Sequence, residues 1–310
     1  MKLFHGLVVV FLAANVVASS DYHLFLDQYG KIYDAQREVI FYKNLALIKE
    51  HNIDENQTYK LAVNQFADLT FDEFQQAHAA ANIPVHNCPS CESSENDSLP
   101  DNVDWRDHGA VTPVKNQGHC GSCWTFSATG AMEGFLKLKT GRLQSLSEQQ
   151  IVDCDTQGDG CQGGFARYGF EYAAKNGIQL EQCYPYTGSD GTCSLNNTNG
   201  CTVYGVTGYN SVDSSTAALK LALNKQPVSV AIYAAGTSFQ FYSSGVYNDP
   251  KCYKARDQLD HAVLAVGYTP EAWIVKNSWG QSWGDQGYIY MARGDDMNTC
   301  GILDQPTYPH

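Results

Sequence analysis

Cysteine constrains the fold of this chain more than any other residue type, because 11 of the 310 residues are cysteine. Such a number is unusual in the cytosol and indicates an oxidising compartment, where thiols are joined in disulfides. The number is also odd, so at least one thiol must stay unpaired or pair outside the chain. That thiol is the first place to look for chemistry.

The first 20 residues predict a secretory signal peptide. Lys2 is their only formal charge, and a largely apolar stretch over residues 7–18 leads to the small residues Ser19 and Ser20. This stretch is too short to span a bilayer, and a buried N-terminal helix is the alternative. We expect a destination in the lysosome or vacuole, or outside the cell, with no membrane attachment after signal removal. Glycosylation sequons, which fit this route, begin at Asn56, Asn96 and Asn196.

The charge balance excludes one class of partner. The chain has 20 basic and 33 acidic residues, a net charge of −13, whereas a nucleic-acid partner requires a cationic face that displaces counterions from phosphates. We therefore expect no nucleic-acid partner. Residues 21–98 carry 5 basic and 13 acidic side chains, and residues 99–310 carry 14 and 20. Any docking between these two pieces must depend on apolar contacts and specific pairs.

The composition divides the chain into two pieces. Residues 21–81 are rich in charge and helix formers, with apolar residues at helical spacing from Ile40 to Ile48 and a second helix from Thr70. Residues 82–98 lose this periodicity and gain Asn, Ser, Pro and acidic residues. This composition predicts an exposed, cleavable linker.

The residues around Cys123 predict a reactive thiol. A glycine-rich turn from Gln117 leads into a helical pattern that stops at Thr140 and Gly141, which places Cys123 in the first turn of a helix. The unpaired N–H groups and the macrodipole at this end favour an anion. We therefore expect the helix to lower the pKa of the thiol.

A thiolate nucleophile also requires a base, and His261 is the histidine that stands out. It opens the apolar run 262–266, which is typical of a buried strand, and a ring at such an edge requires a hydrogen-bond partner. Asn277 follows a second apolar strand, and its side-chain oxygen can accept from the ring. Cys123, His261 and Asn277 would then act as nucleophile, base and orienting residue.

These residues resemble those of the papain-like cysteine peptidases, papain and the cathepsins. The signature Cys-Gly-Ser-Cys-Trp stands at residues 120–124, and His261 and Asn277 follow Cys123 by 138 and 154 residues. The resemblance implies an α+β fold, in which a helical half and a β-barrel-like half meet at the active-site cleft behind a helical prosegment. The sequence pattern agrees, with mainly helices before residue 208 and mainly strands after it.

The same resemblance implies the role of each residue. Cys123 is the nucleophile, and His261 is its ion-pair partner and its general acid and base. Asn277 orients the ring of His261, and Trp279 shields their hydrogen bond from water. Gln117 donates a side-chain N–H to the oxyanion beside the backbone N–H of Cys123. The implied activity is that of a monomeric endopeptidase on protein and peptide substrates, without a metal or other cofactor.

The N-terminal piece resembles the inhibitory prosegments of cathepsin L-type proteases. The matching positions are Arg37, Phe41, Asn44, Ile48, Asn52, Asn64, Phe66 and Asp68, and the departures are Tyr33 in place of Glu and Ala62 in place of Gly. We expect an inhibitory prosegment over residues 21–98 that runs through the cleft in the reverse direction to a substrate, followed by a catalytic domain over residues 99–310. A free-standing helical domain is the alternative. Acid is expected to trigger activation through carboxylates such as Asp68.

The cysteines can be paired with one left over. The expected pairs are Cys120–Cys161, Cys154–Cys193, Cys252–Cys300, Cys183–Cys201 and Cys88–Cys91. Family positions imply the first three. The fourth has no counterpart in the common pattern, and an exchange of partners among Cys154, Cys193 and Cys201 is the alternative; the fifth lies in the linker. Cys123 remains unpaired.

The resemblance also implies where a peptide substrate lies. Gly163 and Gly164 would bring bare backbone to an extended peptide, a tight turn being the alternative. The apolar members of the S2 pocket favour Leu, Val or Phe at P2, and the neutral amide of Gln305 would tolerate Arg without preferring it. The residues that map to this pocket are Phe165, Ala166, Ala231, Leu259 and Gln305.

Two rival hypotheses concern the thiols and the site as a whole. The Cys-x-x-Cys pairs at residues 88–91 and 120–123 would suit a zinc ribbon or a thiol-disulfide oxidoreductase. However, 28 residues separate the pairs and no strand precedes the second one. A catalytically silent peptide binder would have lost the nucleophile, whereas every catalytic position is filled here.

Overall fold

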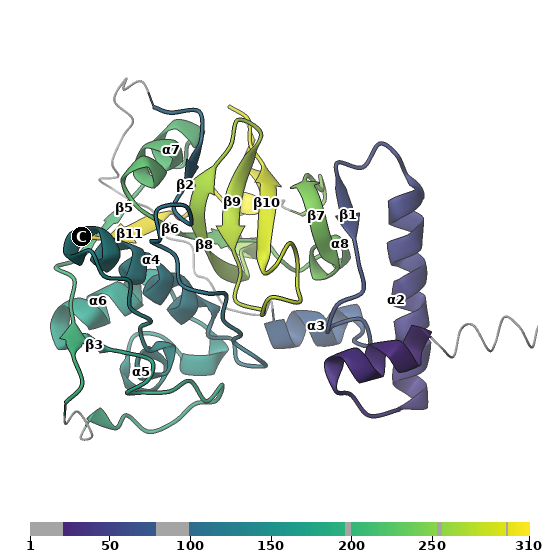
Figure 1. Ribbon diagram of the computed structural model, residues 1–310, viewed down its shortest axis with the longest axis horizontal. Coiled ribbons are helices and arrows are strands. Elements are labelled where there is room, and N and C mark those ends of the chain that lie inside the picture. The colour runs from purple at the N-terminus through teal and green to yellow at the C-terminus, as the bar shows by residue number, and fades with distance from the viewer. Residues whose placement is uncertain (1–20, 79–98, 196–199, 253–255, 296) are drawn as a thin grey trace, which may run out of the picture.

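The structure is a computed structural model that describes residues 21–78, 99–195, 200–252, 256–295 and 297–310. The predicted signal peptide, the linker with Cys88 and Cys91, and the sequons at Asn96 and Asn196 lie outside the described residues. Figure 1 shows three parts, namely a helical N-terminal segment, a helical half and a half built on a sheet. The predicted α+β fold class is confirmed.

The N-terminal segment forms the helices expected from its apolar spacing. A helix over residues 21–29 is followed by α2 (Ala35–Ile53), β1 (Tyr59–Leu61) and α3 (Phe71–His78). The carboxylate of Asp34 caps α2 by accepting from the backbone N–H groups of Gln36 and Arg37. Three positions of the prosegment pattern form the buried face of α2: Phe41, Asn44 and Ile48.

The helical half is built around α4 (Cys123–Thr140), which is buried along most of its length. It ends where Gly141 adopts a left-handed conformation with a φ of 74°. α5 (Glu148–Cys154) begins after Ser147, whose hydroxyl accepts from the N–H of Gln150. The remaining elements are η1 (Gly160–Gln162), α6 (Ala166–Asn176), β3 (Ile178–Gln179) and β4 (Val203–Tyr204).

The other half is built on a sheet of nine strands in the order β1-β7-β10-β9-β8-β6-β11-β5, with β2 beside β8. The central strands β6 (Val228–Ile232), β8 (His261–Tyr268) and β9 (Ala272–Lys276) are buried at every residue. Their continuous apolar runs explain this burial on both faces. The other elements are β2 (Val103–Asp104), β5 (Tyr209–Ser211), α7 (Thr216–Lys225), α8 (Thr237–Gln240), β7 (Tyr242–Tyr247), η3 (Arg256–Gln258), β10 (Tyr288–Ala292), η4 (Thr299–Gly301) and β11 (Thr307–Pro309).

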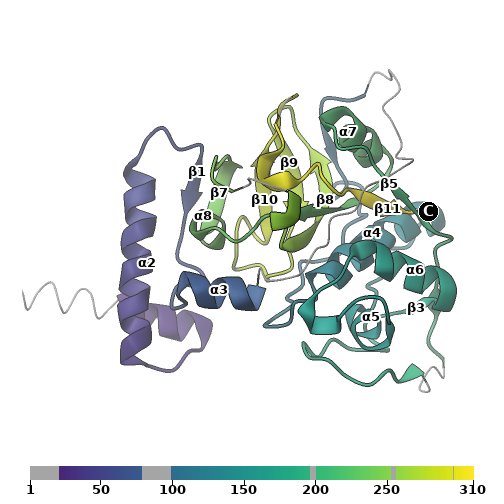
Figure 2. The ribbon, with the colours of Figure 1, turned by 180° about the vertical axis from the view of Figure 1, so that it is seen from behind.

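The three parts are joined by strand pairing and helix packing. β1 pairs antiparallel with β7, so the N-terminal segment extends one edge of the sheet, and α2 lies on the outer side of β1 (Figures 1 and 2). α4 packs on β8, where a Cβ atom on Gly130 would meet Leu264 at 2.8 Å. The predicted division near residue 208 is only approximate, because β2 precedes it and lies in the sheet.

Four disulfides match four of the five expected pairs. They are Cys120–Cys161, Cys154–Cys193, Cys183–Cys201 and Cys252–Cys300. The first three tie together loops of the helical half, and the last one lies in the sheet half. Cys123 is the one free cysteine of the described residues. None of the described helices is long and apolar enough to cross a membrane.

Candidate active site

Cys123 is the first residue of α4, as predicted. Its thiol lies against the start of β8, where the backbone N–H of Ala262 is 3.4 Å from Sγ. Only 1% of the residue is exposed. The helical half therefore presents the thiol directly to the strand that carries His261.

His261 is held from two sides at the first position of β8. Its Nε2 lies 2.7 Å from Oδ1 of Asn277, and its ring stacks on that of Trp279 at 4.6 Å between centroids and 27° between planes. His261, Asn277 and Trp279 are all buried. The structure thus brings together the base, the orienting residue and the covering tryptophan that the sequence predicts.

The hydrogen bonds determine which nitrogen of His261 carries the proton. Asn277 Oδ1 can only accept, and it also accepts from the backbone N–H of Ser278 at 2.8 Å. Nε2 of a neutral His261 must therefore be the protonated nitrogen. Nδ1 is buried without a hydrogen-bond partner, so its lone pair is free to take a proton.

Gln117 is anchored so that part of its amide remains available. Its Nε2 donates to the carbonyl of Cys120 at 3.0 Å, and its Oε1 accepts from the Ser278 hydroxyl at 2.6 Å. The amide nitrogen carries two N–H groups, and one of them is used in this way. The second is available to an oxyanion near Cys123. Sequence reasoning missed Ser278, which links Gln117 to the loop of Asn277.

Burial changes the protonation expected for the pair. It raises the pKa of Cys123 to about 12 and lowers the pKa of His261 to about 4. The expectation that the helix start lowers the thiol pKa is therefore wrong for this state. Exclusion of water penalises the charged forms more than the N–H groups near Sγ favour a thiolate. Thiol and imidazole are both neutral while the N-terminal segment is in place.

The two glycines of the expected substrate site have separate structural reasons. Gly163 has a φ of 127°, which side chains rarely adopt. A Cβ atom on Gly164 would meet the ring of Trp124 at 2.8 Å. A tight turn packed on Trp124 therefore accounts for both residues, and their backbone role toward a substrate stays a prediction.

Four of the five predicted S2 residues lie in one apolar cluster with Cys123. Gln305 is half-buried in the loop before β11 and is not part of this cluster. The apolar character predicted for the pocket therefore has a common structural origin. The four members, all less than 9% exposed, are Phe165, Ala166, Ala231 and Leu259.

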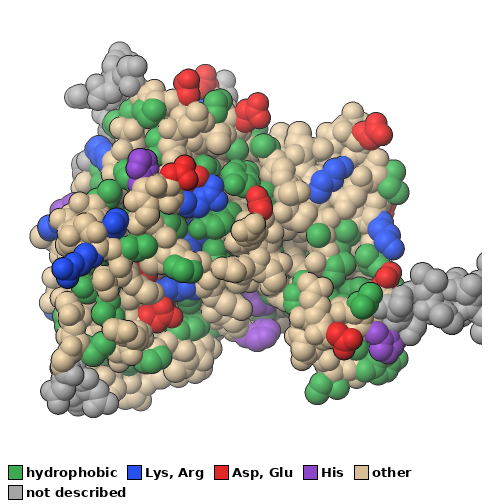
Figure 3. Space-filling model, viewed as in Figure 1, with side chains coloured by type: hydrophobic (Ala, Val, Ile, Leu, Met, Phe, Trp, Pro, Cys, Tyr) green, Lys and Arg blue, Asp and Glu red, His purple; other side chains and the backbone are tan. Residues whose placement is uncertain are grey.

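The C-terminal end of α3 lies over one side of the site. His78 is 5% exposed, and its ring lies 6.1 Å from the ring of Trp279 and 5.3 Å from that of His119. Figure 3 shows histidine side chains in the notch where the N-terminal segment meets the rest of the molecule. The segment therefore contacts the same tryptophan that stacks on His261.

His78 has an unusual environment for a histidine. Its ring approaches the backbone of Gly118, but neither ring nitrogen makes a hydrogen bond of normal geometry. Burial, followed by the nearby charges of His119 and His261, lowers the pKa of His78 to about 3. Sequence reasoning missed this residue, although its place four positions after Phe74 on one helix face was a usable signal.

The disulfides bear on the rival thiol hypothesis. An oxidoreductase would need Cys120 to pair with Cys123, but Cys120 is bonded to Cys161. The described residues also hold no group of three or more His, Cys, Asp or Glu side chains that could bind a metal ion.

Comparisons with known proteins agree with this geometry. The model of the papain family cysteine proteases matches residues 99–310, and that of the cathepsin propeptide inhibitor domain matches residues 22–74. The chain is 48% identical to the probable cysteine protease RD21B of Arabidopsis thaliana, over 88% of the chain and 60% of that relative. It thus spans less than two thirds of that relative's length.

Two further comparisons cover nearly the whole of both proteins. Digestive cysteine proteinase 2 of Homarus americanus is 46% identical, over 97% of this chain and 98% of that protein. The structure of digestive procathepsin L2 proteinase from the larval midgut of Tenebrio molitor superimposes with a TM-score of 0.86 at 36% identity. That match covers 94% of this chain and 99% of the other.

Proposed function

Because the chain belongs to the papain family of cysteine proteases and carries a cathepsin propeptide inhibitor domain, we propose that it is a cysteine endopeptidase made as an acid-activated zymogen. One observation carries the proposal. His261 directs its protonated Nε2 to Asn277 and leaves Nδ1 unpartnered, at the start of the strand whose Ala262 N–H contacts the thiol of Cys123.

The proposed reaction begins when water and substrate replace the N-terminal segment. Nδ1 of His261 takes the proton of Cys123, and the thiolate attacks the scissile carbonyl carbon. The resulting oxyanion accepts from the free amide N–H of Gln117 and from the backbone N–H of Cys123. His261 then protonates the leaving amine, and it later acts as base when water hydrolyses the thioester.

Alkylation of the acid-processed protein tests this function. Iodoacetamide followed by peptide mapping is expected to label Cys123, with loss of peptidase activity in proportion to labelling. Cys120 should stay unlabelled because of its bond to Cys161. Label on Cys120, or full labelling of Cys123 without loss of activity, would contradict the proposal.

Inhibition by the prosegment is supported by the contacts between the N-terminal segment and the loop of Trp279. The amide of Gln65 donates to the Trp279 carbonyl at 2.7 Å and accepts from the Ser282 hydroxyl at 2.8 Å. The rings of Phe66 and Phe74 meet the Trp279 ring edge-on at 5.7 and 5.3 Å. A segment docked on this tryptophan hinders a substrate from reaching the same side of His261.

Acid activation is supported by His78 more directly than by the carboxylates. The docked pKa of His78 lies below its ordinary value of 6.5, so docking is strongest above that pH and weakens as the pH falls toward 3. At pH 5 the cost is about 2 kcal/mol. The groups that act on His78 are the cationic His119, His261 and Lys31, and each of them makes a further proton less favourable.

The acidic partners in the segment respond in a different pH range. Glu73 pairs with Arg37, and this hydrogen bond lowers the pKa of Glu73 to about 2. Its contribution is full above the ordinary pKa of 4.5 and is lost only as the pH falls toward 2. Asp68 pairs with Lys31, and an acid trigger through this pair stays a prediction.

Targeting and specificity complete the proposal. We propose entry into the secretory pathway with a lysosomal, vacuolar or extracellular destination, and Asn56 is an exposed sequon that suits this route. The apolar cluster of Phe165, Ala166, Ala231 and Leu259 suits Leu, Val or Phe at P2. Protein and peptide substrates and the chain's own prosegment are the proposed partners of a monomer.

A further inference from the structure

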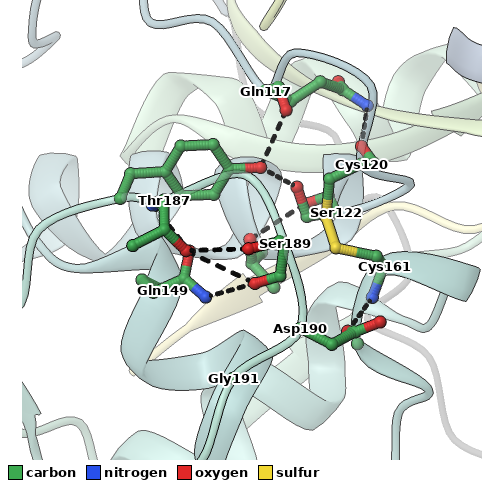
Figure 4. Close-up of a disulfide and its surroundings, with 12 residues drawn as sticks. Gln117, Cys120, Ser122, Gln149, Cys161, Thr187, Ser189, Asp190 and Gly191 are labelled. Carbon is green, nitrogen blue, oxygen red and sulfur yellow. Dashed lines mark hydrogen bonds between the residues drawn. A yellow bond between two sulfur atoms is a disulfide. The ribbon is translucent and has the colours of Figure 1, made fainter.

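A loop of the helical half packs against the turn that leads to Cys123. Tyr186 belongs to this loop, and its hydroxyl lies 2.8 Å from the Gln117 carbonyl and 2.6 Å from the Ser122 hydroxyl. A carbonyl can only accept, so Tyr186 donates to Gln117 and receives the hydrogen bond of Ser122. One hydroxyl thus joins the two ends of the turn over residues 117–122. Figure 4 shows Gln117, Ser122 and the neighbouring loop residues.

The loop itself is held from behind by polar side chains. The amide of Gln149 accepts from the N–H of Thr187 at 2.9 Å and donates to the carbonyl of Ser189 at 2.8 Å. The carboxylate of Asp190 accepts from the N–H of Cys161 at 2.7 Å. Figure 4 shows these contacts beside the Cys120–Cys161 disulfide. The Cys183–Cys201 bridge closes the chain on both sides of Tyr186.

The bond made by Tyr186 does not change with pH in the working range. The ring meets that of Phe126 edge-on at 4.9 Å, and burial raises the pKa of Tyr186 to about 12. The phenol therefore keeps its proton. By contrast, the turn it bridges contains Gly118 in a left-handed conformation with a φ of 63° and open space around it, so the turn needs outside support to hold one shape.

We propose that Tyr186 is a positioning residue for the oxyanion hole, an inference that rests on the proposed function. The two donors of that hole come from opposite ends of the bridged turn, namely the amide of Gln117 and the backbone N–H of Cys123. Tyr186 sets their separation by holding the Gln117 carbonyl and the Ser122 hydroxyl on one oxygen. Donors placed in advance stabilise a developing oxyanion more than donors that must reorganise.

Tyr184 supplies a matched control from the same loop. Its hydroxyl donates to Asp153 at 2.7 Å, and burial raises its pKa to about 12 as well. The described hydrogen bonds of its side chain do not reach the turn over residues 117–122. Tyr184→Phe and Tyr186→Phe therefore remove equivalent hydroxyls, only one of which bridges the turn.

The test uses the acid-processed enzyme and three readouts. For Tyr186→Phe we expect kcat to fall about tenfold with KM within about twofold, which is less than the loss of an oxyanion donor itself. A peptide aldehyde, whose carbon bonds to Sγ while its oxygen enters the hole, should bind weaker by the same factor. The rate and pH profile of alkylation by iodoacetamide, which forms no oxyanion, should not change. Tyr184→Phe should leave all three unchanged.

Each other outcome overturns the inference in an identifiable way. Unchanged aldehyde affinity in Tyr186→Phe excludes a positioning role. Equal losses in alkylation and aldehyde binding indicate a disturbed thiol or fold instead. If Tyr186→Phe does not fold, Ser122→Ala removes one arm of the bridge, and unchanged aldehyde affinity there again excludes the role. Absence of peptidase activity in the native chain would contradict the proposed function and not this inference alone.

Discussion

The wall that carries Cys123 and the N-terminal segment that covers it are held by opposite kinds of interaction. The wall is closed by disulfides and by a phenol whose pKa is about 12. The segment is attached by an edge strand, side-chain amides, ion pairs and an aromatic cluster around a histidine whose pKa is about 3. The difference teaches that permanence and release are assigned to separate regions, so acid can remove the cover without loosening the site.

The most drastic way to break this comparison is to remove the thiol. Cys123→Ala is expected to abolish self-processing, so that an uncleaved precursor with its full prosegment persists at acid pH, as seen on a denaturing gel. The change removes one buried sulfur and should leave the fold intact. A control is cleavage of this precursor by a trace of native enzyme, which should still occur. Efficient self-processing by the variant would refute the nucleophile.

A second change weakens the fixed wall. The Cys183→Ser and Cys201→Ser double variant opens a bridge with a sequence separation of 18, and we expect the free energy of unfolding to fall by about 3 kcal/mol. The loss should be equal at pH 5 and pH 7, because no titrating group is involved. Denaturant titration of the processed enzyme measures it. The matched Cys252→Ser and Cys300→Ser variant should also lose stability but should keep its aldehyde affinity.

A third change acts on the cover. His78→Phe keeps a ring among Phe66, Phe74 and Trp279 but cannot accept a proton. The acceleration of processing between pH 7 and pH 5, relative to the native chain, should shrink by up to about thirtyfold, the equivalent of about 2 kcal/mol. Processing rates at the two pH values in dilute protein measure this ratio.

Two control variants accompany this measurement. His51 belongs to the same segment but bonds to the Tyr59 carbonyl at 3.1 Å, so His51→Gln should keep the native ratio. Asp68→Asn tests the carboxylate trigger, because it removes the partner of Lys31 at every pH. An unchanged ratio in His78→Phe together with a lost ratio in Asp68→Asn would transfer the trigger to Asp68.

The smallest expected effect concerns a residue at the rim of the apolar cluster. The native enzyme should prefer Leu to Arg at P2, because Gln305 provides an amide and no charge. Gln305→Glu should raise cleavage after P2 Arg about fivefold through a partly exposed ion pair worth about 1 kcal/mol. A peptide library measures both preferences. A native profile with P2 Arg above P2 Leu would remove Gln305 from the pocket floor.

Local signals explain what could be predicted from the sequence. The start of α4 at Cys123, its end at Gly141 and the strands after His261 and before Asn277 follow from glycine placement and apolar runs a few residues long. The prosegment helix α2 likewise follows from spacing within one segment. These features depend on neighbours in the chain, so sequence reasoning reaches them.

What could not be predicted depends on residues far apart in the chain. The contact of Tyr186 with Gln117 spans 69 positions, and His78 gains its environment from Trp279 and His119 only after the segment docks. The direction of the thiol pKa was wrong for the same reason. A helix start acts locally, whereas exclusion of water from Cys123 is a property of the assembled fold.

The pairing of β1 with β7 has a consequence for the life of the protein after processing. While the N-terminal segment is attached, the backbone groups of β7 are used on both sides, by β1 and by β10. Its removal turns β7 into an edge strand, the kind of surface that recruits other chains and promotes aggregation. The propeptide domain thus also acts as an intramolecular chaperone for that edge, and the mature molecule carries it open to solvent.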